Sequence, residues 1–334
     1  MVKNISKNKG DKMCLTRYVN PFTDFGFKKI FGASANQDLL IDFLNEVLKL
    51  EGKDRIKHIE ELNPEQLGYL KEDRGAVFDI YCRTEKGEYC IIEMQKMNQH
   101  NFFERCLFYS TFPIRQQIEK GSNPWSKENL KIKVYIVGVL DFIFQHDDKV
   151  ETEIYFHDEV RHRRFYDSVK MIFLEMPKFN KTIDELETRY DKWLYVLSNL
   201  SRLPRMPEAL KDAIFEKLFK VATVADYSDS EQITYNFAQN NYIATKDAIN
   251  FAEDEGREKG RKEGRKEGRE EGRKEGREEG RKEGREEGRK EGIKEGRINT
   301  LSNIAKSLKS KNKSDKEIAE LLNITINELK KILK

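Results

Sequence analysis

The sequence predicts an α/β fold with a mixed β-sheet, followed by an all-α region, a charged glycine-repeat stalk and a small helical C-terminus. Three observations support this prediction. Runs rich in β-branched and aromatic residues recur between residues 56 and 174, and an apolar pattern at helical spacing interrupts them. From residue 181 onward the apolar residues repeat at helical spacing only. A chain of 334 residues suffices for one large domain or two smaller ones.

The N-terminal part begins with a segment, residues 1–17, that we expect to be a disordered basic leader because its lysines lie among Asn and Ser. The first helix is predicted after Ser34 and Gln37, which have the spacing of a capping box. One broad apolar face follows them: Leu39, Leu40, Phe43, Leu44, Val47 and Leu48. This pattern predicts an amphipathic helix buried along that face.

The predicted sheet is built from runs of alternating or continuous apolar residues. Four strand-like runs come first: residues 56–62, 77–83, 89–97 and 132–142. A helical pattern at 101–119 precedes the last of them. A three-strand meander that leads through a crossover helix to a further strand is typical of a mixed sheet. Two more candidates, 153–156 and 169–174, extend this domain, which we place at residues 18–180.

An all-α region is expected at residues 181–254. Thr182 and Glu185 form a capping-box pattern at its start. The apolar residues that follow at helical spacing are the expected core of this region: Trp193, Leu194, Leu197, Leu200, Phe215 and Phe219.

Residues 255–297 form a tetrapeptide repeat with a glycine at every fourth position from Gly256 to Gly296. Charges of alternating sign at i, i+4 favour a helix by a few tenths of a kcal/mol per pair. Eleven glycines each oppose it by about 0.8–1 kcal/mol relative to alanine. We therefore expect a solvated stalk that is marginally helical at best. We favour a plain spacer, because the charges of the repeat pair with one another. The alternative is a stalk that oligomerises or contacts nucleic acid.

The C-terminal segment, residues 298–334, holds eight lysines and four acidic residues. Capping boxes at Ser314 and Thr325 predict two short helices, 315–322 and 326–333. This spacing resembles small helix-turn-helix modules that bind DNA. The alternative is a helical knob that caps the stalk or self-associates, which would make the protein a homo-oligomer through this region.

Composition excludes several classes of protein. The net charge of +3 is the near-cancellation of 62 basic and 59 acidic residues, and it says little about partners. Four cysteines without the close spacing of zinc ligands, and without an apolar N-terminal leader, indicate reduced thiols and a cytoplasmic protein. Cys82 and Cys90 are expected to be small core residues. No run approaches 18 apolar residues, so no membrane span is expected.

The stretch Cys90-Ile91-Ile92-Glu93-Met94-Gln95 is otherwise typical of a buried strand, yet it contains a carboxylate and an amide. A glycine-containing turn centred on Lys86 makes this run and the preceding one an antiparallel hairpin. In that register Cys82 faces Cys90 and Asp79 faces Glu93. Because side chains alternate between faces, Asp79, Glu93 and Gln95 share one face.

Two carboxylates brought together in an apolar hairpin repel each other and lose hydration unless a cation lies between them. Mg²⁺ is the expected cation, with Mn²⁺ as a substitute, because this hard ion takes a few carboxylate oxygens and keeps waters for chemistry. Gln95 is then expected to orient the attacking water or a phosphate oxygen, since an amide cannot act as a base.

Asp79 followed after a hairpin by Glu93-Met94-Gln95 resembles the PD-(D/E)xK nuclease signature. Together with the stretches 20–32 and 102–109, the chain is similar to recombination-promoting nucleases and related transposases over residues 18–145. The resemblance implies a restriction-endonuclease-like core and a Mg²⁺-dependent DNA endonuclease linked to recombination or transposition, in which Asp79 and Glu93 bind the metal. The chain departs from the pattern where Phe78 replaces the proline and Gln95 replaces the lysine.

Three further residues are candidates for this site. Asp24 could be an additional acidic ligand of the metal. The alternative is that Asp24 belongs to a turn or to the capped N-terminus of a helix. Arg105 and Lys96 are candidates for contacts with DNA phosphates. The alternative for each is an exposed charge that is solvated and binds nothing. The rival to the nuclease is a catalytically weak module of mobile-element or defence machinery that binds nucleic acid or self-associates.

Overall fold

The computed structural model describes residues 16–66, 75–99, 101–117 and 132–333. Nearly all of the predicted basic leader lies outside these residues. The chain forms two compact units, residues 1–247 and 248–334. Among the described residues no helix combines the length and the apolar character needed to cross a membrane.

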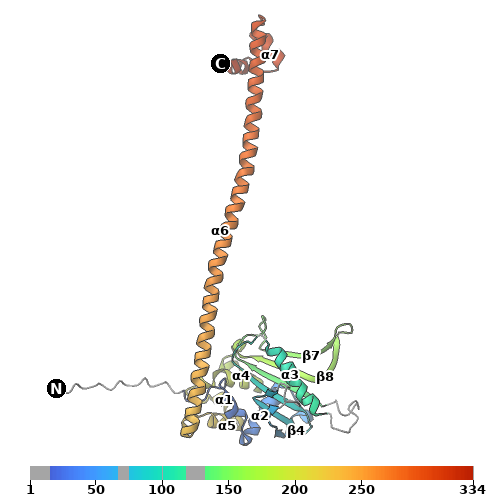
Figure 1. Cartoon of the computed structure of the whole chain (residues 1–334), viewed down its shortest axis with the longest axis vertical. Coiled ribbons are helices and arrows are strands. Elements are labelled where there is room, and N and C mark those ends of the chain that lie inside the picture. The colour runs from blue at the N-terminus through green and yellow to red at the C-terminus, as the bar shows by residue number, and fades with distance from the viewer. Residues whose placement is uncertain (1–15, 67–74, 100, 118–131, 334) are drawn as a thin grey trace, which may run out of the picture. The chain divides into compact units, whose positions relative to one another are not determined.

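The first unit is an α/β domain around a six-stranded mixed sheet, which confirms the predicted fold class (Figure 1). The strands lie in the order β1-β4-β5-β6-β8-β7. Their bounds are Ile59–Glu61 (β1), Ile80–Thr84 (β4), Tyr89–Gln95 (β5), Val134–Leu140 (β6), Glu151–Asp158 (β7) and Arg163–Glu175 (β8). The pairs β5–β6 and β6–β8 are parallel and the other pairs are antiparallel. Two short strands, β2 (Glu65–Gln66) and β3 (Ala76–Val77), pair separately.

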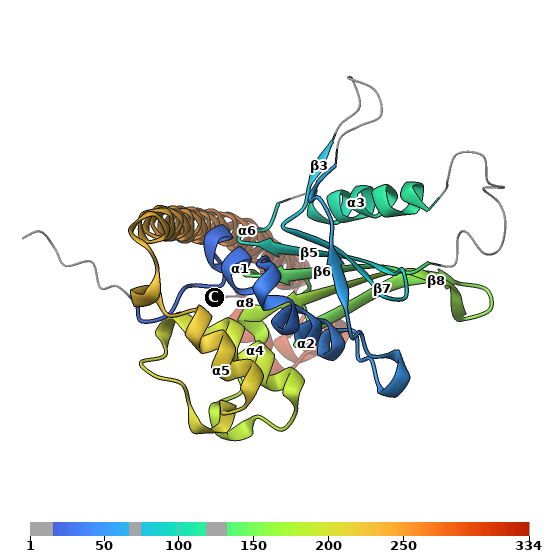
Figure 2. The same ribbon diagram turned by 90° about the horizontal axis from the view of Figure 1, so that it is seen from below.

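The central strands are buried on both faces, as expected for parallel strands covered by helices. Helix α3 (Phe102–Gln116) covers one face, and its side chains Phe102, Cys106 and Phe112 share a core cluster with β5, β6 and β8. The opposite face is covered by several helices (Figure 2). These are α1 (Asp24–Phe31), α2 (Gln37–Val47), α4 (Arg189–Asn199) and α5 (Ala213–Val221). Short 3₁₀ helices lie in the connections: η1 Ser34–Asn36, η2 Gly52–Asp54, η3 Met176–Lys178, η4 Ile183–Glu185, η5 Leu200–Arg202, η6 Glu208–Leu210 and η7 Val224–Asp226.

The predicted core residues agree with the structure, and so do the strands except the run 77–83, which is divided: Val77 ends β3, and β4 begins at Ile80 after Asp79. The six apolar residues expected as core after residue 181 are all buried, and they pack in the same cluster as α1 and α2. Cys82 and Cys90 are free, buried thiols, as predicted. The Thr182–Glu185 capping box forms, and it opens η4 rather than an α-helix.

The expected capping box at Ser34 is wrong. Ser34 opens η1, and its hydroxyl donates a hydrogen bond to Glu61 in β1 at 3.1 Å. Helix α2 begins at Gln37 after Asn36, whose side chain donates to the carbonyl of Lys29 in the last turn of α1 and does not cap α2. The side chains of Ser34 and Asn36 therefore bond to other elements of the fold and not to the N-terminus of α2. Packing of its apolar face stabilises this helix.

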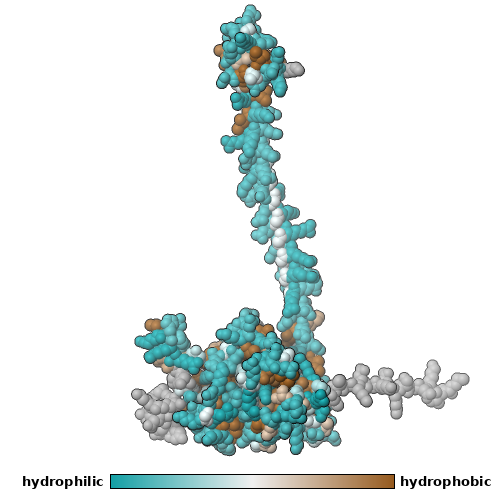
Figure 3. All heavy atoms as spheres, turned by 180° about the vertical axis from the view of Figure 1, so that it is seen from behind, coloured by the Kyte–Doolittle hydropathy of each residue, from teal (hydrophilic) through white to brown (hydrophobic). Residues whose placement is uncertain are grey.

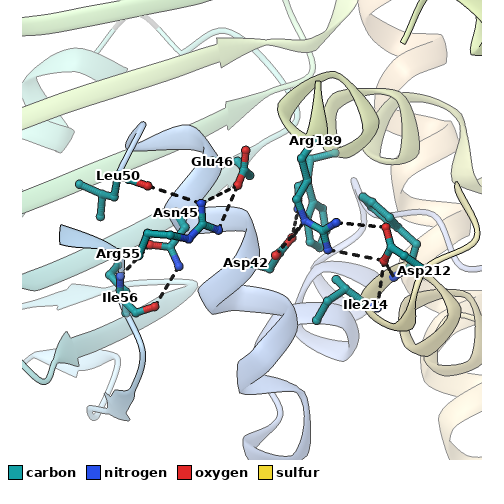
Figure 4. Close-up of polar contacts among 11 residues, drawn as sticks. Asp42, Asn45, Glu46, Leu50, Arg55, Ile56, Arg189, Asp212 and Ile214 are labelled. Carbon is teal, nitrogen blue, oxygen red and sulfur yellow. Dashed lines mark hydrogen bonds and ion pairs between the residues drawn. The ribbon is translucent and has the colours of Figure 1, made fainter. Parts of the chain in front are cut away.

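A partly buried ion-pair network joins three of the helices on the α1 face (Figure 4). Arg189 of α4 donates from Nε to both carboxylate oxygens of Asp42 in α2, at 2.9 and 2.8 Å. The indole N–H of Trp193 donates to the same carboxylate at 2.7 Å. Arg189 also donates to Asp212, which caps the N-terminus of α5 through the N–H groups of Ile214 and Phe215. One arginine thus fixes α2, α4 and α5 against one another.

Helix α6 (Asp229–Ser310) includes the whole glycine repeat. We expected the repeat to be marginally helical at best, and this expectation is wrong. The expected solvation is confirmed, since every residue from 255 to 297 is exposed (Figure 3). The comparison of glycine cost with charge pairing applies to an isolated peptide, in which the helix must also nucleate within the repeat. Tyr235 near the start of α6 is buried in the domain core, and Ala305 near its end is buried in the C-terminal cluster. Packed turns on both sides supply the nucleus, so the repeat only propagates a helix.

Ion pairs at i, i+4 support the repeat helix at four places: Glu253–Arg257, Glu258–Lys262, Glu278–Lys282 and Glu286–Lys290. A Cβ added to any of the eleven repeat glycines would meet no atom within 4 Å. Packing within the chain therefore does not require glycine at these positions.

The second unit ends in two short helices, α7 (Asp315–Leu322) and α8 (Ile326–Leu333), at the predicted positions. Both predicted capping boxes form, with Glu317 accepting from Ser314 and Glu328 accepting from Thr325. Asn323 adopts a left-handed conformation (φ 52°) that ends α7. A small apolar cluster joins α6, α7 and α8: Ala305, Ile318, Ala319 and Leu329.

Candidate active site

The hairpin of β4 and β5 brings Asp79 and Glu93 together. Cys82 pairs with Cys90 and Ile80 with Ile92, so Asp79, directly before β4, stands at the register position opposite Glu93. The backbone N–H of Asp79 donates to Glu93 Oε1 at 3.3 Å, and the N–H of Met94 donates to Asp79 Oδ2 at 2.8 Å. The predicted convergence of the two carboxylates is confirmed.

Gln95 and Arg105 complete the cluster on the side of the sheet that α3 covers. Gln95 follows Glu93 by two residues in β5, and Arg105 Nη2 donates to Gln95 Oε1 at 2.8 Å. Gln95 Nε2 donates to the carbonyl of Met97 at 3.1 Å. Of the sequence-predicted residues, the structure therefore joins Asp79, Glu93, Gln95 and Arg105.

A glycine allows α3 to approach this cluster. Gly138 of β6 is the register partner of Glu93. A Cβ at Gly138 would lie 2.8 Å from Phe173 Cδ1, closer than real Cβ atoms come, and 3.3 Å from Phe102 Cζ, tighter than most Cβ contacts. Phe102 is the first residue of α3 and lies one turn before Arg105. The bare backbone at Gly138 thus lets the first turn of α3 pack close to the strand beside Glu93.

The two carboxylates are held in an environment that opposes their ionisation. Glu93 is only 5% exposed. Burial raises the pKa of Glu93 to about 8, and the charge of Asp79 adds to this effect. Burial also raises the pKa of Asp79, although the Met94 N–H and the positive charge of Lys28 act in the opposite direction. A bound cation would relieve both the lost hydration and the mutual repulsion.

The donor set fits a hard divalent cation. Each carboxylate has one oxygen engaged by a backbone N–H. Within the described chain, Asp79 Oδ1 and Glu93 Oε2 accept no hydrogen bond. Among the described residues no group of three or more His, Cys, Asp or Glu side chains is arranged to hold a metal ion. Mg²⁺ commonly binds through one or two carboxylates and keeps several waters, so the pair is sufficient.

Asp24 and Lys96 lie outside the hydrogen-bonded cluster. Asp24 is the first residue of α1 after Thr23, whose hydroxyl accepts from the N–H of Gly26, so cap chemistry is present at this position. The charge of Asp24 nevertheless raises the pKa of Asp79, after burial as the main cause, which indicates that Asp24 lies near the pair. Lys96 directly follows β5 and is half-buried, with no hydrogen bond or ion pair to other described residues.

Sequence reasoning missed Lys28. It forms an ion pair with Asp24 at 2.8 Å, and its charge acts on both Asp79 and Glu93. The signal was present, because Asp24 and Lys28 are four residues apart and share one face of a helix. The eight residues of α1 did not stand out as a helix in the sequence.

The pKa of Glu93 predicts how pH and metal affect stability. The unfolded chain releases the Glu93 proton near pH 4.5, whereas the native state retains it up to about pH 8. Without metal, the free energy of unfolding should therefore fall as pH rises between these values. Added Mg²⁺ should raise the melting temperature more at about pH 8.5 than at about pH 5.5, and Glu93→Gln should remove this difference. A metal-induced shift of equal size at both pH values would contradict the prediction.

The chain matches one family of known proteins, described as PD-(D/E)XK nuclease family transposase, over residues 21–252. The match includes α1, the β4–β5 hairpin and α3, and it covers more than half of the chain. No curated protein and no solved structure matches it. With this match and the paired carboxylates of the hairpin, the chain belongs to the PD-(D/E)XK nuclease family transposases.

Proposed function

We propose that this protein is a divalent-metal-dependent DNA endonuclease that acts in recombination or mobile-element transposition. The observation that supports it best is the buried pair of Asp79 and Glu93, each with one oxygen that accepts no hydrogen bond from the described residues, in a chain that belongs to a nuclease family. In a structural ion pair a cationic side chain would bond to such carboxylates. Here Lys28 and Arg105, whose charges act on the pair, bond to Asp24 and Gln95 instead. The pair is therefore suited to an external cation.

In this proposal Asp79 and Glu93 hold the cation, Mg²⁺ or Mn²⁺, through their free oxygens. When bound, the cation supplies Lewis acidity toward a phosphate oxygen and lowers the pKa of the attacking water. Gln95 positions that water. Its amide is fixed by Arg105 and by the Met97 carbonyl, and it still has one N–H and one lone pair to offer. The attacking water gives one proton to solvent and its oxygen bonds to phosphorus, while the bond to the leaving sugar oxygen breaks and that oxygen takes a proton from solvent.

A supercoiled-plasmid assay tests the proposal. We expect nicked or linear products with Mg²⁺ or Mn²⁺ and none with EDTA. Products that persist in EDTA would exclude the metal assignment. Binding of the plasmid without any product in either metal would favour the rival, a catalytically weak nucleic-acid-binding module.

The C-terminal unit is the proposed second contact with DNA. In α8, Asn327, Lys330 and Lys331 are exposed while Leu329 is buried, so one face of this helix is free to enter a groove. Truncation at Arg297 should weaken DNA binding and flatten its salt dependence. In the full chain, replacing Lys330 and Lys331 with Gln should lower the salt slope by about 0.9 for each phosphate that these lysines neutralise. If truncation instead changes the oligomeric mass by light scattering and leaves the slope unchanged, the unit is a self-associating knob.

A further inference from the structure

The hairpin of β7 and β8 continues beyond the six-stranded sheet (Figure 1). Strand β6 pairs only with Val169–Glu175 of β8, so among the described residues β7 is the one strand beside residues 163–168. The register of β7 and β8 shifts twice between Ile154 and His157, and such bulges bend and twist a strand pair. We call residues 155–165 the arm. The arm is therefore a two-stranded ribbon set apart from the sheet.

The arm presents apolar side chains to solvent. Val160 in its turn is 84% exposed and Phe165 is 73% exposed. Neither belongs to the two core clusters of the domain. A two-stranded ribbon is only marginally stable by itself, so exposed apolar side chains on it are not needed for folding. Apolar side chains gathered on a projection of the surface are typical of a contact with a partner.

The basic residues of the arm indicate the chemistry of that partner. The arm contains three arginines and no lysine: Arg161, Arg163 and Arg164, all exposed. Arg163 forms no ion pair with any other described residue. The guanidinium of Arg164 lies 4.0 Å from the ring centroid of Tyr155 and 3.7 Å from Glu153, which orients it along the ribbon. The planar guanidinium binds two phosphate oxygens at once, so this composition favours a phosphate-bearing partner.

The acidic residues of the arm lie at its turn. Asp158 accepts from the backbone N–H groups of Val160 and Arg161 and pairs with the guanidinium of Arg161 at 2.9 Å. These bonds hold the turn and occupy both carboxylate oxygens. Glu159 is exposed and lies 3.8 Å from His157. Residues 163–165 on β8 therefore form a continuous cationic and aromatic stretch next to the turn.

We propose that the arm is a DNA-binding element that enters the major groove of duplex DNA, where Arg163 and Arg164 contact phosphates and Phe165 packs against the bases. The major groove admits a two-stranded β-ribbon, and apolar side chains in it contact the methyl groups of thymine. This inference rests on the proposed nuclease function, which supplies DNA as the substrate.

The arm lies far from the carboxylate pair along the strands. Glu93, Gly138 and Phe173 are register partners in neighbouring strands. Arg163 precedes Phe173 by ten residues of β8, which corresponds to about 30 Å. That distance is the length of about nine base pairs of DNA. The arm therefore contributes to binding of the duplex and not to the chemical step.

A salt titration of DNA binding tests this inference. The full chain is titrated with a labelled duplex in Ca²⁺, and fluorescence anisotropy gives the affinity at each salt concentration. Arg163→Gln should lower the salt slope by about 0.9, because one phosphate fewer is neutralised. Phe165→Ala should weaken binding about tenfold and leave the slope unchanged, since it removes apolar burial and no charge.

Arg205→Gln is the matched control. Arg205 is also exposed and without an ion pair among the described residues, but it lies between η5 and η6, whose Leu200 and Leu210 pack in the cluster on the α1 face. This variant should keep the slope of the unchanged protein. Equal slopes for Arg163→Gln and Arg205→Gln would overturn the inference. A changed oligomeric mass in Arg163→Gln with an unchanged slope would assign the arm to a protein contact instead.

Cleavage separates this inference from the nuclease proposal. In single-turnover reactions with saturating protein, Arg163→Gln should cut at the rate of the unchanged protein, and a slower rate would place Arg163 in the chemical step and overturn the assignment. If the unchanged protein cuts nothing while Arg163→Gln lowers the slope, the nuclease proposal fails and the arm still binds DNA. If the unchanged protein cuts and the slopes are equal, the nuclease proposal stands and the arm is not a DNA contact.

Discussion

Replacing Asp79 or Glu93 with alanine is expected to abolish metal-dependent DNA cleavage, with a loss of at least about 10³-fold in rate. Each substitution removes one of the two carboxylates that hold the cation, and two remaining oxygens on one residue bind it weakly. The assay is plasmid nicking over a range of Mg²⁺ concentrations. The stability of each variant is measured in parallel, because Asp79→Ala leaves the N–H of Met94 and Glu93→Ala leaves the N–H of Asp79 without its acceptor, while the repulsion between the carboxylates is removed.

Glu60→Ala is the control for this experiment. Glu60 lies on the edge strand β1 of the same sheet and pairs with Arg83 at the surface, with more than half of its side chain exposed. This variant should cut at the rate of the unchanged protein. Nicking that persists in both Asp79→Ala and Glu93→Ala would show that the hairpin carboxylates do not hold the metal.

Asp42→Ala is expected to have the largest effect on stability, about 3 kcal/mol in the free energy of unfolding. The substitution leaves the guanidinium of Arg189 and the indole N–H of Trp193 without their shared acceptor, and Trp193 is fully buried. Urea unfolding followed by tryptophan fluorescence measures the change. Asp38→Ala in the same helix removes an exposed pair with Lys217 and should cost less than about 1 kcal/mol. Equal losses in the two variants would mean that the network adds nothing beyond helix propensity.

The hairpin could be predicted from the sequence because its information is local. The turn at Lys86 sets the register, and the alternation of faces then places Asp79, Glu93 and Gln95 together without knowledge of the rest of the fold. The C-terminal helices were predictable for the same reason, since Ser314 and Thr325 mark their starts by side-chain caps that form within three residues.

The parts that could not be predicted depend on contacts between distant segments. Ser34 has a capping pattern, but its hydroxyl bonds to Glu61, 27 residues away. The hydrogen bond from Arg105 to Gln95 depends on how α3 packs against the sheet. The charge of Lys28 acts on the carboxylate pair, and no spacing in the sequence relates α1 to β5. The domain boundaries and the catalytic roles of the site residues stay predictions.

The absence of a side chain at Gly138 determines how much room the catalytic cluster has. A methyl group there would collide with the ring of Phe173 and press on the ring of Phe102, the first residue of α3, so both rings would have to shift. Arg105 lies one turn further along the same helix, so a displacement of Phe102 would disturb its bond to Gln95. A change of one carbon atom, at a residue with no polar function, would then misalign the amide relative to Glu93 while every charge of the site stays in place. The position of the catalytic amide therefore depends on β6, the strand next to the hairpin, and on the absence of a side chain at Gly138.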